Sequence, residues 1–119
     1  MLFVEDDPSV RYVVGHILTR QGHHTLLAAT ANEASALLLD IPMTPDAAVL
    51  DVLLLGMNGV EFGRLLKRLF PMDRLIFMTG WPNIALLDQR PRDSFVLEKP
   101  FNTADLLTAI DASVSDWAL

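Results

Sequence analysis

Polar side chains that could do chemistry follow four separate apolar runs of this 119-residue chain. They are the consecutive acids Glu5, Asp6 and Asp7, and the single residues Asp51, Thr79 and Lys99. Crowded carboxylates repel one another, and a hard divalent cation relieves that repulsion. Oxygen ligands without a closed protein cage suit Mg²⁺. A carboxylate beside a cation, a lysine and a hydroxyl could be the nucleophile of a phosphoryl transfer.

The elements that must position these residues can be predicted from the apolar patterning. Strands are predicted over residues 2–4, 25–28, 47–50, 75–78 and 95–97. Helical apolar spacing follows the cap signals Asp7–Pro8, Thr30 and Asn58, and recurs from about Thr103 to Trp117. Between Pro82 and Pro91, a helix over Ile84 to Gln89 is confined to about two turns.

Strands that are apolar on both faces and alternate with helices predict an α/β fold with a parallel sheet between two helical layers. The length allows a single domain over residues 1–119. In such a sheet, ligands bind beyond the carboxyl ends of the strands. We therefore expect the acids, Asp51, Thr79 and Lys99 to converge on one edge. Asp7, which precedes Pro8, is assigned to helix capping rather than to the metal.

Composition excludes several function classes. Nine Lys and Arg against 15 Asp and Glu give a formal charge of −6, which disfavours nucleic-acid binding by this domain. Cysteine is absent, so thiolate metal sites and cysteine nucleophiles are excluded. The sequence shows neither an apolar run long enough to span a membrane nor a signal peptide, and the expected location is the cytoplasm.

Five stretches in this order resemble the receiver domain of two-component response regulators over essentially the whole chain. They are Phe3-Val4-Glu5-Asp6-Asp7-Pro8, Leu50-Asp51, Met57-Asn58-Gly59, Met78-Thr79-Gly80 and Glu98-Lys99-Pro100-Phe101. The resemblance implies a flavodoxin-like (βα)5 fold with the strand order 2-1-3-4-5. The Met-Thr-Gly-Trp and Glu-Lys-Pro-Phe segments look like receivers attached to hybrid histidine kinases, so the chain is expected to be either a stand-alone regulator or such a receiver.

The resemblance also implies roles for individual residues. Asp51 corresponds to the aspartate that accepts a phosphoryl group. Mg²⁺ would be bound directly by Asp6 and through water by Glu5, with Asp51 and the backbone carbonyl of Leu53 as further ligands. Thr79 would hydrogen-bond the phosphoryl group and Lys99 would form an ion pair with it. The Lys99–Pro100 bond is expected to be cis, as is usual in the family.

The implied function is a phosphorelay switch rather than a turnover enzyme, because it would catalyse only its own phosphorylation and dephosphorylation. The implied partner is a histidine kinase or a histidine phosphotransfer protein, and the family also allows a homodimer. Neither nucleic acid nor a membrane is expected as a partner of this domain.

Some positions depart from the family pattern. Leu53 and Trp81 occupy positions that tune hydrolysis in the family, and two bulky apolar side chains there predict a slowly hydrolysing phosphoaspartate. The shortened fourth helix departs from the face that receivers use to dimerise or signal. Val96 stands where the family carries an aromatic switch residue, so the family's coupling of a Thr79 movement to an aromatic flip is not expected to carry over unchanged. One alternative is a degenerate receiver that binds proteins independently of phosphorylation. A phosphatase is a weaker alternative, since Leu53 stands where that class carries a second aspartate.

Overall fold

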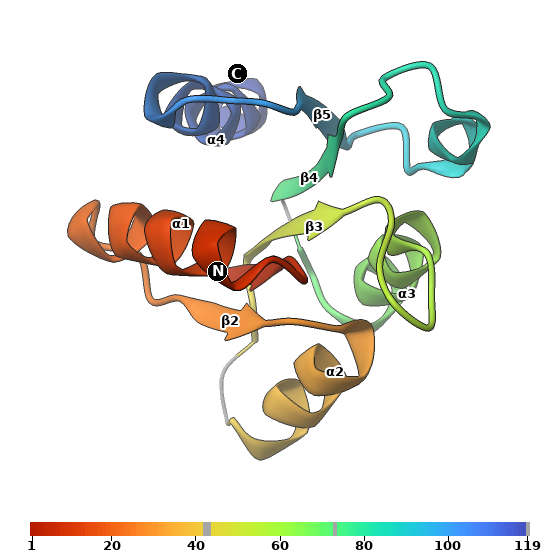
Figure 1. Cartoon of the computed structure of the whole chain (residues 1–119), viewed down its shortest axis with the longest axis horizontal. Helices are drawn as coiled ribbons and strands as arrows, with labels where there is room; N and C mark the ends of the chain where they lie inside the picture. Colours follow the sequence, from red (N-terminus) through yellow and green to blue (C-terminus); the bar gives the residue numbers. More distant parts are fainter. Residues whose placement is uncertain (42–43, 73, 119) are drawn as a thin grey trace.

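A computed structural model describes residues 1–41, 44–72 and 74–118 of the chain, with side chains described as far as residue 110. Five parallel strands form one sheet in the order β2-β1-β3-β4-β5. Figure 1 shows the helices packed around this sheet. The strands are β1 Leu2–Val4, β2 Leu26–Ala28, β3 Ala47–Asp51, β4 Arg74–Thr79 and β5 Phe95–Glu98; the helical elements are α1 Pro8–Arg20, α2 Ala31–Asp40, α3 Gly59–Leu69, the 3₁₀ helix η1 Ala85–Gln89 and α4 Thr103–Ala118. The predicted fold class and strand order are confirmed.

The helices begin where their capping residues indicate. Asp7 accepts hydrogen bonds from the backbone N–H groups of Ser9 and Val10, which confirms its assignment as a cap. The side chains of Thr30 and Asn58 likewise accept from the N–H three residues on, at the starts of α2 and α3. These bonds satisfy donors that have no partner within a helix. Helix positions are therefore set by local chemistry.

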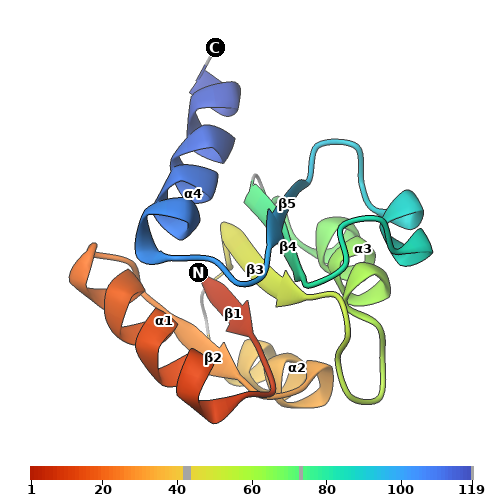
Figure 2. The ribbon, with the colours of Figure 1, turned by 45° about the horizontal axis from the view of Figure 1, so that its top comes forward.

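Alternating strand residues divide the core into two layers, one on each face of the sheet. On β3, Ala47 and Val49 pack beneath α1 and α4, whereas Ala48 and Leu50 pack beneath α2 and α3. Figure 2 shows α1 and α4 on one side of the sheet and α2 and α3 on the other. Both faces of each inner strand are buried, as the apolar runs predicted. The carboxyl ends of the strands remain as the polar edge.

The fourth helical unit is not an α-helix. The segment 85–89 forms a 3₁₀ helix, and Ile84, which precedes it, makes no side-chain capping hydrogen bond. Prolines at 82 and 91 bracket the segment and deny it the length over which an α-helix becomes stable. Leu87 nevertheless inserts into the core beneath α3. The short helix expected between the two prolines is thus present, and it is a 3₁₀ helix of five residues rather than an α-helix.

Two residues that continue the apolar helical spacing, one on α1 and one on α3, are exposed. Val13 on α1 is 54% exposed, and Leu69 at the end of α3 is 63% exposed. Leu69 is the last residue of α3, and Val13 borders the hollow between α1 and the start of α4. The side chain of Trp117, where the last predicted helix ends, lies outside the described residues.

Within the described residues, none of the helices has the length and apolar character needed to cross a bilayer.

Candidate functional site

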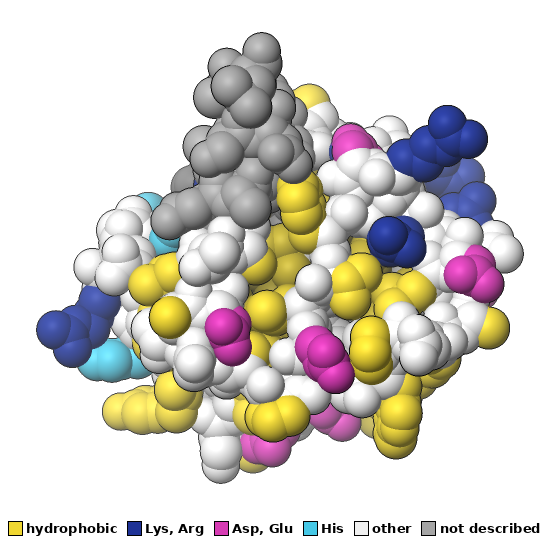
Figure 3. All heavy atoms as spheres, turned by 90° about the horizontal axis from the view of Figure 1, so that it is seen from above, with side chains coloured by type: hydrophobic (Ala, Val, Ile, Leu, Met, Phe, Trp, Pro, Cys, Tyr) yellow, Lys and Arg dark blue, Asp and Glu magenta, His cyan; other side chains and the backbone are white. Residues whose placement is uncertain are grey.

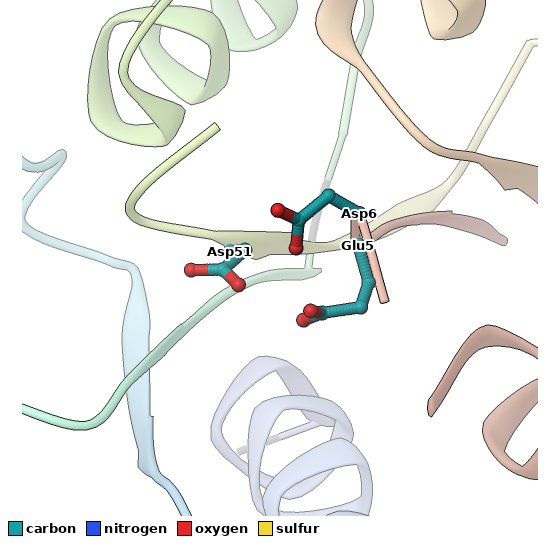
Figure 4. Close-up of side chains that lie close together, drawn as sticks. All are labelled: Glu5, Asp6 and Asp51. Atoms are coloured by element: carbon teal, nitrogen blue, oxygen red, sulfur yellow. The ribbon is translucent and has the colours of Figure 1, made fainter. Parts of the chain in front are cut away.

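The carboxyl edge of the sheet gathers three carboxylates. Glu5 and Asp6 lie on the segment that leaves β1, and Asp51 is the last residue of β3, which is the strand beside β1. One carboxylate oxygen from each of the three lies within 4.8 Å of the others. Figure 4 shows the three side chains side by side. Glu5 and Asp51 are buried and Asp6 is exposed, so the group opens toward solvent on one side only.

Lys99 neutralises part of this charge. Its ammonium lies 2.7 Å from a carboxylate oxygen of Glu5 and 2.7 Å from one of Asp51. Lys99 follows β5, and its own N–H donates to the carbonyl of Thr79 on β4. The Lys99–Pro100 peptide bond is cis, as the resemblance implied. We call Glu5, Asp6, Asp51, Thr79 and Lys99 the carboxyl-edge cluster.

Burial and mutual charge shift the protonation of this cluster. Burial raises the pKa of Glu5 to about 7, and the negative charge of Asp51 adds to the rise although the hydrogen bond from Lys99 opposes it. Burial acts to lower the pKa of Lys99, but its hydrogen bonds to Asp51 and Glu5 outweigh burial and raise that pKa. Glu5 and Lys99 thus hold protons more tightly than free side chains do.

Thr79 closes the same edge at the end of β4. Its side chain is buried, and its hydroxyl exchanges hydrogen bonds with the backbone of Trp81, accepting from the N–H at 3.0 Å and donating to the carbonyl at 3.3 Å. The hydroxyl is therefore committed to the turn after β4. To serve a group on Asp51 it would have to give up the donation to Trp81.

A hollow of about 530 Å³ lies over the cluster. It is lined by Glu5, Asp6, Asp7, Asp51, Leu53, Thr79, Gly80, Trp81 and Lys99. Leu53 donates its backbone N–H to Asp51 at 3.1 Å, which orients that carboxylate. The side chains of Leu53 and Trp81 are 46% and 64% exposed and give the hollow an apolar rim. Every residue of the predicted site is thus found at this hollow.

Two positioning residues were missed by the sequence analysis. Arg11 on α1 donates to the backbone carbonyls of Glu5 and Asp6, at 2.8 and 2.9 Å, and so holds the loop that carries both acids. A Cβ on Gly59 would lie 1.9 Å from the carbonyl oxygen of Asp51, so only glycine lets α3 begin this close to β3. The Met57-Asn58-Gly59 motif signalled the glycine; no local pattern signalled Arg11.

The donor chemistry of the cluster fits Mg²⁺. Three carboxylates face a single ammonium, which leaves an excess of negative charge that a hard divalent cation would offset. Asp6, which has no ion-pair partner among the described side chains, lies on the open side of the group. Glu5, Asp6 and Asp51 are therefore the residues that would hold the ion.

The family model of the response regulator receiver domain matches residues 1–111. The response regulator receiver protein CpdR of Brucella abortus is 29% identical over 93% of this chain and 92% of its own length. The DNA-binding transcriptional regulator NtrC of Klebsiella pneumoniae is 30% identical over 96% of this chain but only 24% of its own length.

The chain spans less than half the length of the transcriptional regulators that it matches. Among solved structures, the chemotaxis protein CheY4 of Vibrio cholerae superposes with a TM-score of 0.81, covering 94% of this chain and 95% of its own. At 24% identity, this likeness supports the fold alone.

Proposed function

The chain belongs to the receiver domains of two-component response regulators, and on that premise we propose that Asp51 accepts a phosphoryl group from a phosphohistidine and so switches protein–protein interactions. The donor would be a histidine kinase or a histidine phosphotransfer protein, acting in the cytoplasm. The observation that carries the proposal is the buried Asp51 carboxylate at a strand end, with the Lys99 ammonium at 2.7 Å and two further carboxylates beside it.

In the proposed transfer, an oxygen of Asp51 forms a bond to phosphorus while the P–N bond of the phosphoimidazole breaks and the imidazole leaves with the electron pair. Lys99 stays within reach of the oxygens of the new acyl phosphate and balances their charge. Mg²⁺, when held by Glu5, Asp6 and Asp51, supplies charge neutralisation for the transferring group. The Leu53 N–H keeps the carboxylate oriented.

Thr79 provides the link to signalling in this proposal. Its hydroxyl would exchange its donation to Trp81 for one to the phosphoryl group, which would pull on the turn after β4. Hydrolysis by water returns the Asp51 carboxylate and inorganic phosphate. The domain would therefore be a switch that catalyses its own phosphorylation and dephosphorylation, not a turnover enzyme.

The test is the intact mass of the protein after incubation with acetyl phosphate and Mg²⁺. We expect one added phosphoryl group on the unaltered chain. The control variant Asp40→Asn, which removes an exposed acid at the last residue of α2 and outside the cluster, should gain the same group. The adduct should be absent from Asp51→Asn and from samples containing EDTA. No adduct, together with no response to beryllium fluoride, would overturn the proposal and favour a degenerate receiver that binds proteins without phosphorylation.

The apolar rim predicts a long-lived adduct. Leu53 and Trp81 stand over the hollow, where they would obstruct an attacking water. We expect the double variant Leu53→Asn, Trp81→Glu to lose its phosphoryl group roughly tenfold faster, since its polar side chains admit water. The lifetime is read from the decay of the mass adduct after acetyl phosphate is removed. An unchanged lifetime would contradict this role for the rim.

A further inference from the structure

Away from the carboxyl-edge cluster, four arginines line one hollow of about 430 Å³ between α3 and the segment that follows η1. Arg64 and Arg68 are four residues apart on α3 and so share one helix face. Arg90 and Arg92 project from the other wall. All four are exposed. We call this feature the arginine groove.

The arginines of the groove have no acidic partner among the described side chains. The ion pairs among the described side chains join Lys67 to Asp93, Arg74 to Asp46, and Lys99 to Glu5 and Asp51. The pair nearest the groove uses Lys67 to neutralise Asp93, and this contact lowers the pKa of Asp93. Asp88 lines the groove but is not ion-paired. The groove therefore presents uncompensated positive charge.

This charge stands out against the rest of the chain. Nine residues are Lys or Arg, and five of them, at positions 64, 67, 68, 90 and 92, belong to α3 and the segment after η1, although the net charge is −6. Figure 3 shows basic side chains gathered on the right of the molecule, the side that holds α3 and η1 in Figure 1. Like charges four residues apart on a helix cost stability rather than add to it. Folding alone gives no reason for the cluster.

The backbone behind the groove is held in place. Leu87 of η1 is buried in the core under α3. Arg90 donates both its backbone N–H and its guanidinium to the carbonyl of Leu87, at 3.1 and 3.2 Å. Ser94 bonds the carbonyl of Pro91 through its N–H and its hydroxyl. A partner would thus meet a surface that is already formed, which lowers the entropy cost of binding.

We propose that the arginine groove binds an acidic segment of a partner protein, through carboxylates that pair with the four guanidinium groups. Planar guanidinium groups match carboxylates in two-point contacts. A nucleic acid is disfavoured, because a long polyanion would also meet the acidic remainder of the domain. The groove shares no lining residue with the hollow over Asp51, so the proposal does not depend on phosphorylation.

The test is the fluorescence anisotropy of a labelled decapeptide of alternating Glu and Gly, titrated with the full chain at low salt. Arg68→Gln and Arg92→Gln should each weaken binding about threefold, the size expected of an exposed ion pair. Arg20→Gln is the matched control, because Arg20 is also an exposed arginine in the last turn of a helix but lies on α1. It should bind as the unaltered chain does.

Asp88→Asn should change the peptide affinity in the opposite direction. It removes the carboxylate that lines the groove, so the acidic peptide should bind about twofold more tightly. Asp51→Asn should leave peptide binding unchanged, so failure of the phosphoacceptor proposal and failure of this one are separable. Three results would overturn the proposal: no binding of the peptide, equal losses in Arg20→Gln and Arg68→Gln, or tighter binding of a labelled ten-nucleotide oligo(dT) than of the peptide.

Discussion

The carboxyl-edge cluster and the arginine groove each bring several like charges together. The two regions differ in how far those charges are buried and in whether the protein neutralises them. At the carboxyl edge, two of the three acids are buried and a lysine from another strand end bridges them. In the groove, all four arginines face solvent and none is ion-paired among the described side chains.

The difference reflects the cost of charge in each place. A buried carboxylate must be compensated within the protein or take up a proton, and both occur at the carboxyl edge, where Lys99 bridges two acids and the pKa of Glu5 rises to about 7. Exposed guanidinium groups are solvated by water and screened by salt, so they need no counter-charge within the protein. Substitutions at the carboxyl edge should therefore affect folding, whereas those in the groove should affect only binding.

The largest effect on the free energy of unfolding is expected at Gly59, where the start of α3 lies closest to the backbone of Asp51. Gly59→Ala would drive a Cβ into the carbonyl oxygen of Asp51 and displace the start of α3 from β3, lowering the free energy of unfolding by about 2–3 kcal/mol. Gly80→Ala, at a glycine whose Cβ would meet nothing within 4 Å, should change it by less than about 1 kcal/mol. Urea denaturation measures both, and equal effects would show that the approach at Gly59 is not constrained.

The second largest loss of stability is expected on removal of Lys99. Lys99→Met leaves Glu5 and Asp51 without their shared cation, at a cost of about 2 kcal/mol in the metal-free protein at pH 8. The cost is below that of a fully buried pair, because Glu5 can take up a proton. Added Mg²⁺ should restore part of the loss. Urea unfolding with and without Mg²⁺ measures this, and undiminished stability without the metal would show that Lys99 does not compensate the acids.

The carboxyl edge should also give the metal-free protein a pH signature. Because the pKa of Glu5 rises from 4.5 to about 7 on folding, the folded state binds this proton more tightly than the unfolded state does. That contribution to stability is complete below pH 4.5 and is lost as the pH rises to about 7. Glu5→Gln should therefore flatten the fall in stability between pH 5 and pH 8. Parallel pH profiles for the two proteins, measured by urea unfolding, would contradict the shift.

The smallest effect is expected in the groove. Replacing Arg64, Arg68, Arg90 and Arg92 together with Gln should change the free energy of unfolding by less than about 1 kcal/mol. No ion pair is broken, and relief of the repulsion offsets the loss of the hydrogen bond from the Arg90 guanidinium to the Leu87 carbonyl. Thermal and urea unfolding provide the measurement. A loss comparable to that of Lys99→Met would erase the contrast between the two regions and give the arginines a structural role.

Much of the carboxyl-edge cluster was predictable from the sequence, because its ingredients are local. Apolar runs locate the strands, and parallel strands bring their carboxyl ends to one edge, so Glu5, Asp51, Thr79 and Lys99 must lie near one another. Capping at Asp7 and Asn58 is likewise a matter of residues three or fewer apart. Short-range patterns determine such features whatever the rest of the chain does.

Other features depend on which segments the fold brings together. Three-dimensional geometry decides that Arg11 donates hydrogen bonds to the loop after β1. It also decides that the Thr79 hydroxyl bonds the backbone of Trp81. The arginine groove joins α3 to a segment more than 20 residues farther along the chain, across the 3₁₀ turn that replaces a full helix. The sequence by itself determined the strands, the caps and the polar residues at the strand ends, since each follows from neighbouring residues. Only the tertiary structure decided how side chains from distant segments share the surface, because packing rather than local preference sets those distances.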